Sequence, residues 1–277
     1  MPNIVSLISR IKSLRIQGAS DIAEAAIVTW KNARDKKGAE KRLIAARPTE
    51  PMLRNSLNYL NLYGKPDELL AKLRMDGKKI SEFGANRIKN NSAVFTHCHS
   101  SSVVSALQKA KSQRKKFRVL NTETRPSLQG MKTASELARL RIPVTFHVDS
   151  AARLALMESD IMIIGADAIT SEGSVINKIG SGMFAEVADR HGIPVYVCSH
   201  SWKLDPRTVR GFYEPIEKRK ASEIWKNPPR GVKISNTVFE EIDSKLIEGI
   251  ISELGVFSPD AFIEEVKDCY SWMFKRK

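Results

Sequence analysis

The chain has 277 residues, of which 42% are hydrophobic and 27% are charged, enough apolar material for one large domain or two ordinary ones. No apolar run approaches the roughly 18 residues that span a bilayer, and the N-terminus lacks an uninterrupted signal core, so we expect a cytoplasmic protein outside the membrane. Only three cysteines occur, far apart in the sequence, which argues against a disulfide framework and offers no paired metal-ligand spacing.

The formal charge is +14, from 45 Lys and Arg against 31 Asp and Glu, and this excess favours an anionic partner. The densest basic runs, at 114–116 and 218–220, are short and scattered, and no nucleic-acid-binding motif is present. We therefore expect a phosphorylated small molecule rather than nucleic acid. A basic surface that is merely solvated is the alternative.

Before residue 90, apolar residues recur at helical spacing with almost no β-rich run. This pattern predicts an N-terminal helical domain over residues 1–90. The stretches concerned are Ile4–Leu14, Ile22–Trp30, Met52–Leu62 and Leu69–Ile88.

After residue 90, short β-rich runs alternate with helical ones, which predicts βαβ units and a parallel sheet covered on both faces. The expected fold class is α/β, with the helical domain followed by a Rossmann-like, doubly wound parallel-sheet domain over residues 91–277. The expected strands are 93–95, 117–120, 144–148, 161–164 and 195–198, and the expected helices are 103–110, 132–140 and 183–190.

Polar or charged residues follow each expected strand. Ligands of such sheets bind beyond the carboxyl ends of the strands, so these segments are predicted to converge on one site. The segments are 96–102, 121–126, 149–150, 165–167 and 199–203.

Cys98 opens the serine-rich start of an expected helix, where backbone N–H groups and the helix dipole stabilise a thiolate. The serines that follow it are also suited to holding a phosphate. The alternative is a small hydrophobic residue buried in the core. Cys198, in a strand, and Cys269, in the final amphipathic helix, are predicted to serve packing.

Asp167 follows the hydrophobic run 161–166, where partial desolvation raises the pKa of a carboxyl group. The alternative role is an N-cap or turn residue. Lys178 suits a phosphate or a developing oxyanion. No zinc-type spacing and no glycine-rich nucleotide motif occurs, so we expect neither a metal nor a cofactor.

Four ordered motifs are similar to the family that unites methylthioribose-1-phosphate isomerase, archaeal ribose-1,5-bisphosphate isomerase and the regulatory subunits of translation initiation factor 2B. The motifs are THCHSS at 96–101, ETRPSLQG at 123–130, GADAI at 165–169 and NKIG at 177–180. The resemblance covers almost the whole chain, through QGAS at 17–20, ARPT at 46–49 and GVFSP at 255–259.

The resemblance implies a helical domain packed on a Rossmann-like domain, assembled as a homodimer or a homohexamer built as a trimer of dimers. It also implies a catalytic pair, Cys98 and Asp167, that is kept in the isomerases and is absent from the non-catalytic branch. The segment 201–204 resembles the ribose-bisphosphate branch, so we expect an aldose–ketose isomerase acting on ribose 1,5-bisphosphate, a phosphorylated pentose. Methylthioribose-1-phosphate isomerase and a non-catalytic regulatory subunit are the alternatives.

By the same resemblance Asp167 is the acid that assists ring opening and Cys98 is the base that acts at C2, with proton transfer and hydride shift both left open. Glu123 and Arg125 orient the site, or form a structural ion pair instead. Gln17 stands where the ribose-bisphosphate enzymes have a phosphate-binding arginine, which puts one phosphate contact in doubt. The expected substrate-binding residues are Gln17, Gly18, Ala19, Ser20, Arg47, Ser100, Glu123, Arg125, Gln129, Asn177, Lys178 and Lys203.

Overall fold

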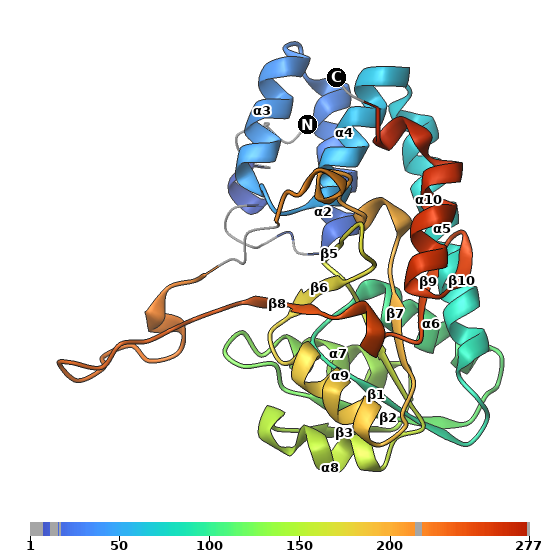
Figure 1. The fold of residues 1–277 in the computed structure, drawn as a ribbon, viewed down its shortest axis with the longest axis vertical. Coiled ribbons are helices and arrows are strands. Elements are labelled where there is room, and N and C mark those ends of the chain that lie inside the picture. The colour runs from blue at the N-terminus through green and yellow to red at the C-terminus, as the bar shows by residue number, and fades with distance from the viewer. Residues whose placement is uncertain (1–7, 12–15, 17, 214–217, 276–277) are drawn as a thin grey trace.

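A computed structural model of the chain describes residues 8–11, 16, 18–213 and 218–275. It places a group of helices at one end and an α/β part at the other (Figure 1). No helix in the described ranges is long and apolar enough to cross a membrane.

The helical part precedes the first strand. Its helices are α2 (Ala19–Asn32), α3 (Lys36–Ala46), α4 (Pro51–Tyr63) and α5 (Pro66–Arg87). Prolines in the first turn begin α4 and α5, and Gly64, at φ 67°, ends α4, because proline suits the first helical turn and glycine tolerates the left-handed conformation. The periodic pattern did not predict α3, which buries only three residues, Ala39, Leu43 and Ala46. Of the expected helix 4–14, residues 8–11 are described and are helical.

The α/β part is built on a seven-stranded sheet in the order β10-β9-β7-β4-β1-β2-β3. All neighbouring pairs are parallel except β9 with β10. The prediction of a mixed α/β fold with a mostly parallel sheet is confirmed. The strands are β1 (Ser92–Thr96), β2 (Phe117–Thr122), β3 (Val144–His147), β4 (Ile161–Ile164), β7 (Val195–Cys198), β9 (Gly249–Ser252) and β10 (Gly255–Phe257).

Alternate residues of the central strands enter different hydrophobic cores, as the two-residue period of a strand requires. Val94 and Ile163 pack with one core, whereas Phe95 and Ile164 pack with the other. The first core includes buried residues of α5, α6 (Ser101–Ser112) and α7 (Gln129–Arg139), and the second includes those of α8 (Ala152–Met157) and α9 (Ser181–Arg190). The sheet is therefore covered by helices on both faces.

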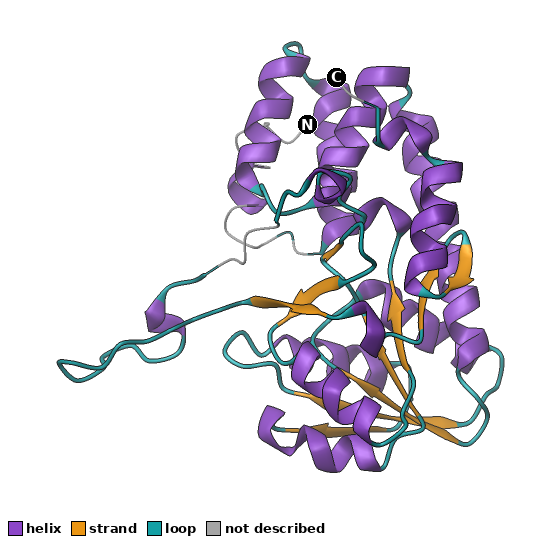
Figure 2. Cartoon of the chain, in the orientation of Figure 1, coloured by secondary structure: helices purple, strands orange, loops and turns teal. Residues whose placement is uncertain are grey.

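A second sheet of three antiparallel strands lies beside the first and has the order β5-β6-β8. Its strands are β5 (Ala168–Ile169), β6 (Val175–Lys178) and β8 (Phe239–Ile242). The described part of the chain between η3 (Thr208–Arg210) and β8 extends away from the body as a long arm, mostly loop (Figure 2).

The C-terminal segment returns to the helical end of the molecule. It contains α10 (Pro259–Cys269) and η6 (Ser271–Met273), and Trp272 of η6 packs against Tyr59 of α4. Cys198 is fully buried, as predicted for a packing residue, but the side chain of Cys269 is exposed, so that prediction is wrong. Cys269 is the last residue of α10, and the residues that this helix buries, Phe262, Ile263 and Val266, belong to its earlier turns. The remaining short 3₁₀ turns are η1 (Asp149–Ala151), η2 (Ser201–Lys203), η4 (Ala221–Glu223) and η5 (Ser244–Leu246).

Candidate active site

A cavity of about 430 Å³ lies between the helical part and the carboxyl ends of the sheet strands. Three helices present their N-terminal ends to it: Gly18, Ser100 and Leu128, the N-cap residues of α2, α6 and α7, all line its wall. Free backbone N–H groups and the helix dipole make such ends favourable for anions. The fold therefore directs three positive helix ends at one cavity.

The cavity also gathers more basic than acidic side chains. Its basic lining residues are Arg47, Lys132, Lys178, Lys203 and Arg219, and its acidic ones are Asp21, Glu136 and Asp167. The positive excess adds to the helix ends, so the site is suited to a ligand that carries phosphate.

Most of the predicted site residues meet at this cavity. Those that line it are Gly18, Ala19, Ser20, Arg47, Cys98, Ser100, Gln129, Asp167, Asn177, Lys178 and Lys203. Gln17 lies outside the described residues. The strand-end residues among them meet because the parallel strands end at a common edge, and the helical part adds Gly18, Ala19, Ser20 and Arg47.

Cys98 lies two residues beyond the end of β1, with φ 65° in the left-handed region that non-glycine residues rarely adopt. Two threonines hold this backbone: Thr124 Oγ1 accepts from the Cys98 N–H at 3.0 Å, and Thr133 Oγ1 donates to the Cys98 carbonyl at 2.8 Å. The thiol donates to Gln129 Oε1 at 3.4 Å. The side chain therefore has a fixed position on the cavity wall.

Burial raises the pKa of Cys98 to about 11, and the nearby charge of Asp167 also raises it, whereas Lys178 lowers it. A backbone hydrogen bond from His99 lowers the pKa of Cys98, in the direction that the sequence predicted, but burial outweighs it. The helix begins with its N-cap at Ser100, whose hydroxyl accepts from Val103 N, and desolvation of Cys98 outweighs the dipole. Cys98 is a thiol at neutral pH.

His97, next to Cys98, is a structural residue. Its Nε2 lies 3.0 Å from the carbonyl oxygen of Ile179, which can only accept, so Nε2 carries the proton and Nδ1, 2.6 Å from Thr122 Oγ1, accepts from that hydroxyl. Burial lowers the pKa of His97 to about 4. The imidazole is therefore neutral, and each of its two nitrogens is used in a hydrogen bond within the protein.

Asp167 lies in the short segment between β4 and β5, and its backbone N–H donates to Ile176 O at 2.8 Å. It begins no helix, so the N-cap alternative is wrong. Among the described residues its carboxylate makes no hydrogen bond, and Asp167 lines the cavity. The approach of this segment to α6 requires glycine at 165, because a Cβ there would lie 2.6 Å from Ser100 Oγ.

Asn177 and Lys178 are the last two residues of β6, and both are buried. Asn177 Nδ2 donates to Ser181 Oγ at 3.0 Å, and Lys178 Nζ lies 4.4 Å from the ring centre of Phe239. Lys203, in η2, donates to the carbonyl of Ala166 at 2.6 Å. Both lysines are therefore held on the cavity wall by contacts within the protein, Lys178 from β6 and Lys203 from η2.

Glu123 and Arg125 do not line the cavity, and the described residues contain no ion pair between them. Arg125 is exposed, and its backbone N–H donates to Asp149 Oδ2 at 2.7 Å while Thr124 N donates to Asp149 Oδ1 at 2.8 Å. Asp149, from the predicted strand end at 149–150, thus holds the backbone of residues 124 and 125 and does not line the cavity.

Sequence reasoning missed several lining residues. Lys132 and Glu136 follow Gln129 by three and seven residues on α7, so helical periodicity alone would have placed them on the same face. Arg219 comes from the arm between η3 and β8, where no local pattern points to the site. Glu50 was also missed, and it lies behind Arg47.

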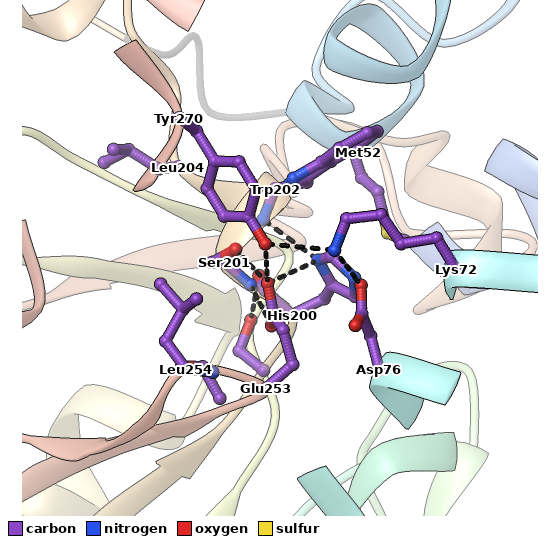
Figure 3. A network of polar contacts seen from close by, with 12 residues as sticks. Met52, Lys72, Asp76, His200, Ser201, Trp202, Leu204, Glu253, Leu254 and Tyr270 are labelled. Carbon is purple, nitrogen blue, oxygen red and sulfur yellow. Dashed lines mark hydrogen bonds and ion pairs between the residues drawn. The ribbon is translucent and has the colours of Figure 1, made fainter. Parts of the chain in front are cut away.

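The position of Lys203 depends on a buried polar network next to η2 (Figure 3). Asp76 Oδ2, from α5, accepts from Lys72 Nζ at 2.6 Å and from His200 Nε2 at 3.2 Å, and His200 Nδ1 accepts from the Trp202 N–H at 3.1 Å. Burial alone would raise the pKa of Asp76, but the hydrogen bonds from His200 and Lys72 outweigh it and hold that pKa below its usual range.

The same network continues through Glu253. Its Oε2 accepts from the Ser201 N–H at 3.0 Å, and its Oε1 accepts from the Ser201 hydroxyl and from the Tyr270 hydroxyl at 3.2 Å. Burial and the Glu253 charge raise the pKa of Tyr270 to about 12. These hydrogen bonds therefore connect the helical part, the sheet and the C-terminal segment next to Lys203.

Asp76, His200 and Glu253 place potential metal-ligating atoms within 4.8 Å of one another. Those atoms already pair with Lys72, Ser201 and the Trp202 N–H, and an ammonium group 2.6 Å from Asp76 opposes a cation. We therefore assign this cluster a role in stabilising the fold and not in binding a metal.

Comparison with known proteins places the chain among relatives over nearly its whole length. The model of the initiation factor 2 subunit family matches residues 5–259. The ribose 1,5-bisphosphate isomerase of Pyrococcus furiosus is 32% identical over 312 residues, covering 98% of this chain and 95% of that protein. The methylthioribose-1-phosphate isomerase of Thermosipho africanus is 35% identical over 261 residues, covering 82% of this chain and 75% of that protein.

Among solved structures, the fold is similar to that of translation initiation factor eIF-2B from Pyrococcus horikoshii OT3. The TM-score is 0.83 at 26% identity, covering 94% of this chain and 98% of that chain.

Proposed function

The chain belongs to the initiation factor 2 subunit family, and we propose that it is an aldose–ketose isomerase that converts ribose 1,5-bisphosphate to ribulose 1,5-bisphosphate. The observation that carries this proposal is the meeting of Cys98 and Asp167 on the wall of one cavity that also presents three helix N-termini and a positive excess of side chains. The near full-length similarity to an isomerase of that name supports it.

A pentose with phosphate on its anomeric oxygen cannot open its ring without help. Asp167, as the acid, gives a proton to the ring oxygen while the bond from that oxygen to C1 breaks. Cys98 enters the reaction as its thiolate form, whose thiol proton has gone to bulk water beforehand; the thiolate removes the proton from C2 and returns it to C1. Asp167 then takes the proton from the C2 hydroxyl, which leaves the ketone, and both groups end as they began.

The structure accounts for how these groups are held and charged. Because Cys98 is a buried thiol with a pKa of about 11, its deprotonation needs a neighbouring positive charge, and Lys178 is the group that lowers that pKa. The phosphates bind to the helix N-termini and to three basic side chains, those of Arg47, Lys178 and Lys203. Each of the two proton-transfer groups is expected to contribute about 10²- to 10⁴-fold to the rate.

We also propose that residues 1–90 form the helical domain and 91–277 a Rossmann-like, doubly wound domain, in keeping with the strand order and with the helices on both faces of the sheet. The proposed assembly is a homodimer or a trimer of dimers in the cytoplasm. Light scattering of the purified chain measures its mass directly, and a monomer at micromolar concentration would contradict the assembly.

The deciding experiment follows ribose 1,5-bisphosphate and, separately, methylthioribose 1-phosphate by ¹³C NMR with the wild type, Cys98→Ser and Asp167→Asn. Ketose signals from the bisphosphate alone, lost in both variants, are expected. Conversion of the thio-sugar alone would reassign the substrate and keep the acid–base pair. A folded wild type that converts neither sugar would overturn the proposed reaction.

A further inference from the structure

Asn55 is a buried residue of α4 that holds the segment on which Lys203 enters the cavity. It is 3% exposed, and its Nδ2 donates to Trp202 O at 2.8 Å and to Leu204 O at 2.9 Å. An amide NH₂ group carries two hydrogens, so it can satisfy both of these buried carbonyls. They are the carbonyls immediately before and immediately after Lys203. The helical part therefore fixes the backbone on either side of this lysine.

Arg54, the preceding residue of α4, holds the end of the same 202–205 segment. Its Nη2 donates to Asp205 Oδ2 at 3.0 Å, and Asp205 is 1% exposed. Its Nη1 donates to the carbonyl of Pro48, in the turn that carries Arg47 to the cavity wall. Arg54 thus connects the segment of Lys203 with the turn of Arg47.

The 202–205 segment also contacts the stretch that contains Asp167. Lys203 Nζ donates to Ala166 O at 2.6 Å, and the N–H of residue 205 donates to Ile169 O at 2.8 Å. Asp167 lies between these two carbonyls in the chain. A displacement of the 202–205 segment would therefore move a basic group of the cavity together with the backbone next to the aspartate.

We propose that Asn55, supported by Arg54, is a positioning residue that sets where Lys203 Nζ lies in the cavity. Asn55 does not line the cavity, so it acts through the backbone that it bonds. The network around Asp76 holds the N–H groups of residues 201 and 202, whereas Asn55 holds the carbonyls on either side of Lys203. The effect on catalysis rests on the proposed function, but the placement of Lys203 does not.

The first test measures the placement of Lys203 without substrate. Lys203 and Lys178 both line the cavity and are 7% and 5% exposed, but only Lys203 lies in the segment that Asn55 holds. Acetylation by acetic anhydride is followed at the two lysine peptides by mass spectrometry. In Asn55→Leu, which keeps the size of the side chain and removes its donor, we expect the rate at Lys203 to rise about tenfold, as for the loss of one ordinary hydrogen bond. The rate at Lys178 is expected to remain that of the wild type.

Asn61→Leu, at an exposed asparagine of the same helix, is the matched control and is expected to change neither rate. A general loosening of the fold would raise the rates at Lys203 and Lys178 together, and this result would overturn the proposal. So would an unchanged rate at Lys203 in a folded Asn55→Leu. If that variant does not fold, as judged by circular dichroism, Arg54→Gln takes its place, with a rise expected at Lys203 alone.

The second test is a double-mutant cycle on kcat/KM for ribose 1,5-bisphosphate, with Asn55→Leu, Lys203→Met and the two changes together. We expect Asn55→Leu alone to lower kcat/KM by about 10- to 100-fold, because a misplacement of about 1 Å that originates away from the chemistry has an effect of this size. Once Lys203 is replaced, the same change is expected to lower it by less than about threefold. Losses that multiply would mean that Asn55 does not act through Lys203 and would overturn the proposal. If no sugar phosphate is converted, the proposed function fails while the acetylation still decides the placement of Lys203.

Discussion

Two buried polar clusters in the described part of the chain lie next to each other and differ in how completely their members are hydrogen-bonded. In the network of Asp76, His200 and Glu253, the carboxylates accept hydrogen bonds from groups on the helical part, the sheet and the C-terminal segment. At the cavity, Asp167 makes no side-chain hydrogen bond among the described residues, and Glu50 leaves one oxygen without a partner.

We assign the fully hydrogen-bonded cluster a structural role and the incompletely bonded cluster a role in binding. A polar cluster satisfied by its own members stabilises one arrangement of the elements that carry it. A cluster whose charges lack internal partners is destabilising until a ligand supplies them, which is how a binding site differs from a core. Lys203 links the two, because the network fixes η2 and η2 carries this lysine into the cavity.

The largest effect that tests this comparison is on stability. Glu253→Ala removes the acceptor of Ser201 and Tyr270, and we expect the free energy of unfolding to fall by about 3 to 5 kcal/mol, as for other broken buried pairs. Asp167→Ala, the matched change at the cavity, is expected to alter it by less than about 1 kcal/mol. Urea denaturation of both variants measures these values, and equal losses would break the comparison.

The second effect concerns the thiol at the cavity. Because the pKa of Cys98 is about 11 and not the ordinary 9.0, its thiolate fraction at neutral pH is about 100-fold lower than that of an ordinary cysteine. The rate of alkylation by iodoacetamide, followed at the Cys98 peptide by mass spectrometry, is expected to keep rising about tenfold per pH unit beyond pH 9.5. A rate that levels off near pH 9 in the folded protein would contradict the raised pKa.

The smallest of the three effects is the pH dependence of stability that comes from Glu50. Burial raises its pKa in the folded protein to about 7, above the ordinary 4.5, so its contribution to stability is complete below about pH 4.5 and is lost as the pH rises through 7. We expect Glu50→Gln to remove this loss and to be more stable than wild type at pH 8.5, by on the order of 2 kcal/mol, but not at pH 5.

Urea denaturation at the two pH values makes that measurement, with Glu68→Gln, a change at an exposed glutamate of α5, as the control in which the pH dependence of the wild type is retained. If wild type and Glu50→Gln differ equally at both pH values, Glu50 acts through packing alone, and the contrast between paired and unpaired clusters would need another explanation.

The hydrophobic patterns predicted β1, β2, β3, β4 and β7 and most of the long helices, because burial of one helix face or of a whole strand imposes a period on the chain. They did not predict α3, which buries few apolar residues, or the short strands β5, β6 and β8, of which β6 and β8 pair with each other across a long separation in the sequence. Local periodicity carries no information about such partners.

The candidate site could also be predicted from the sequence only in part. The polar strand ends and the motifs around Cys98, Asp167 and Lys178 identified most of its wall, and the rule that parallel strands end at one edge brought them together. The sequence could not indicate that Glu123 and Arg125 lie away from the cavity, that Arg219 reaches it from the arm, or that Glu50 lies behind Arg47.

The sequence by itself determined the fold class, the edge of the sheet where the site lies and the residue types that its chemistry uses, since these depend on local pattern and on a general rule of topology. Only the tertiary structure decided which charges are paired, that Cys98 is a thiol and that Glu50 holds a proton near neutral pH. The physical reason is that desolvation and Coulomb interaction depend on what surrounds a group in space, and those surroundings come from segments far apart in the chain.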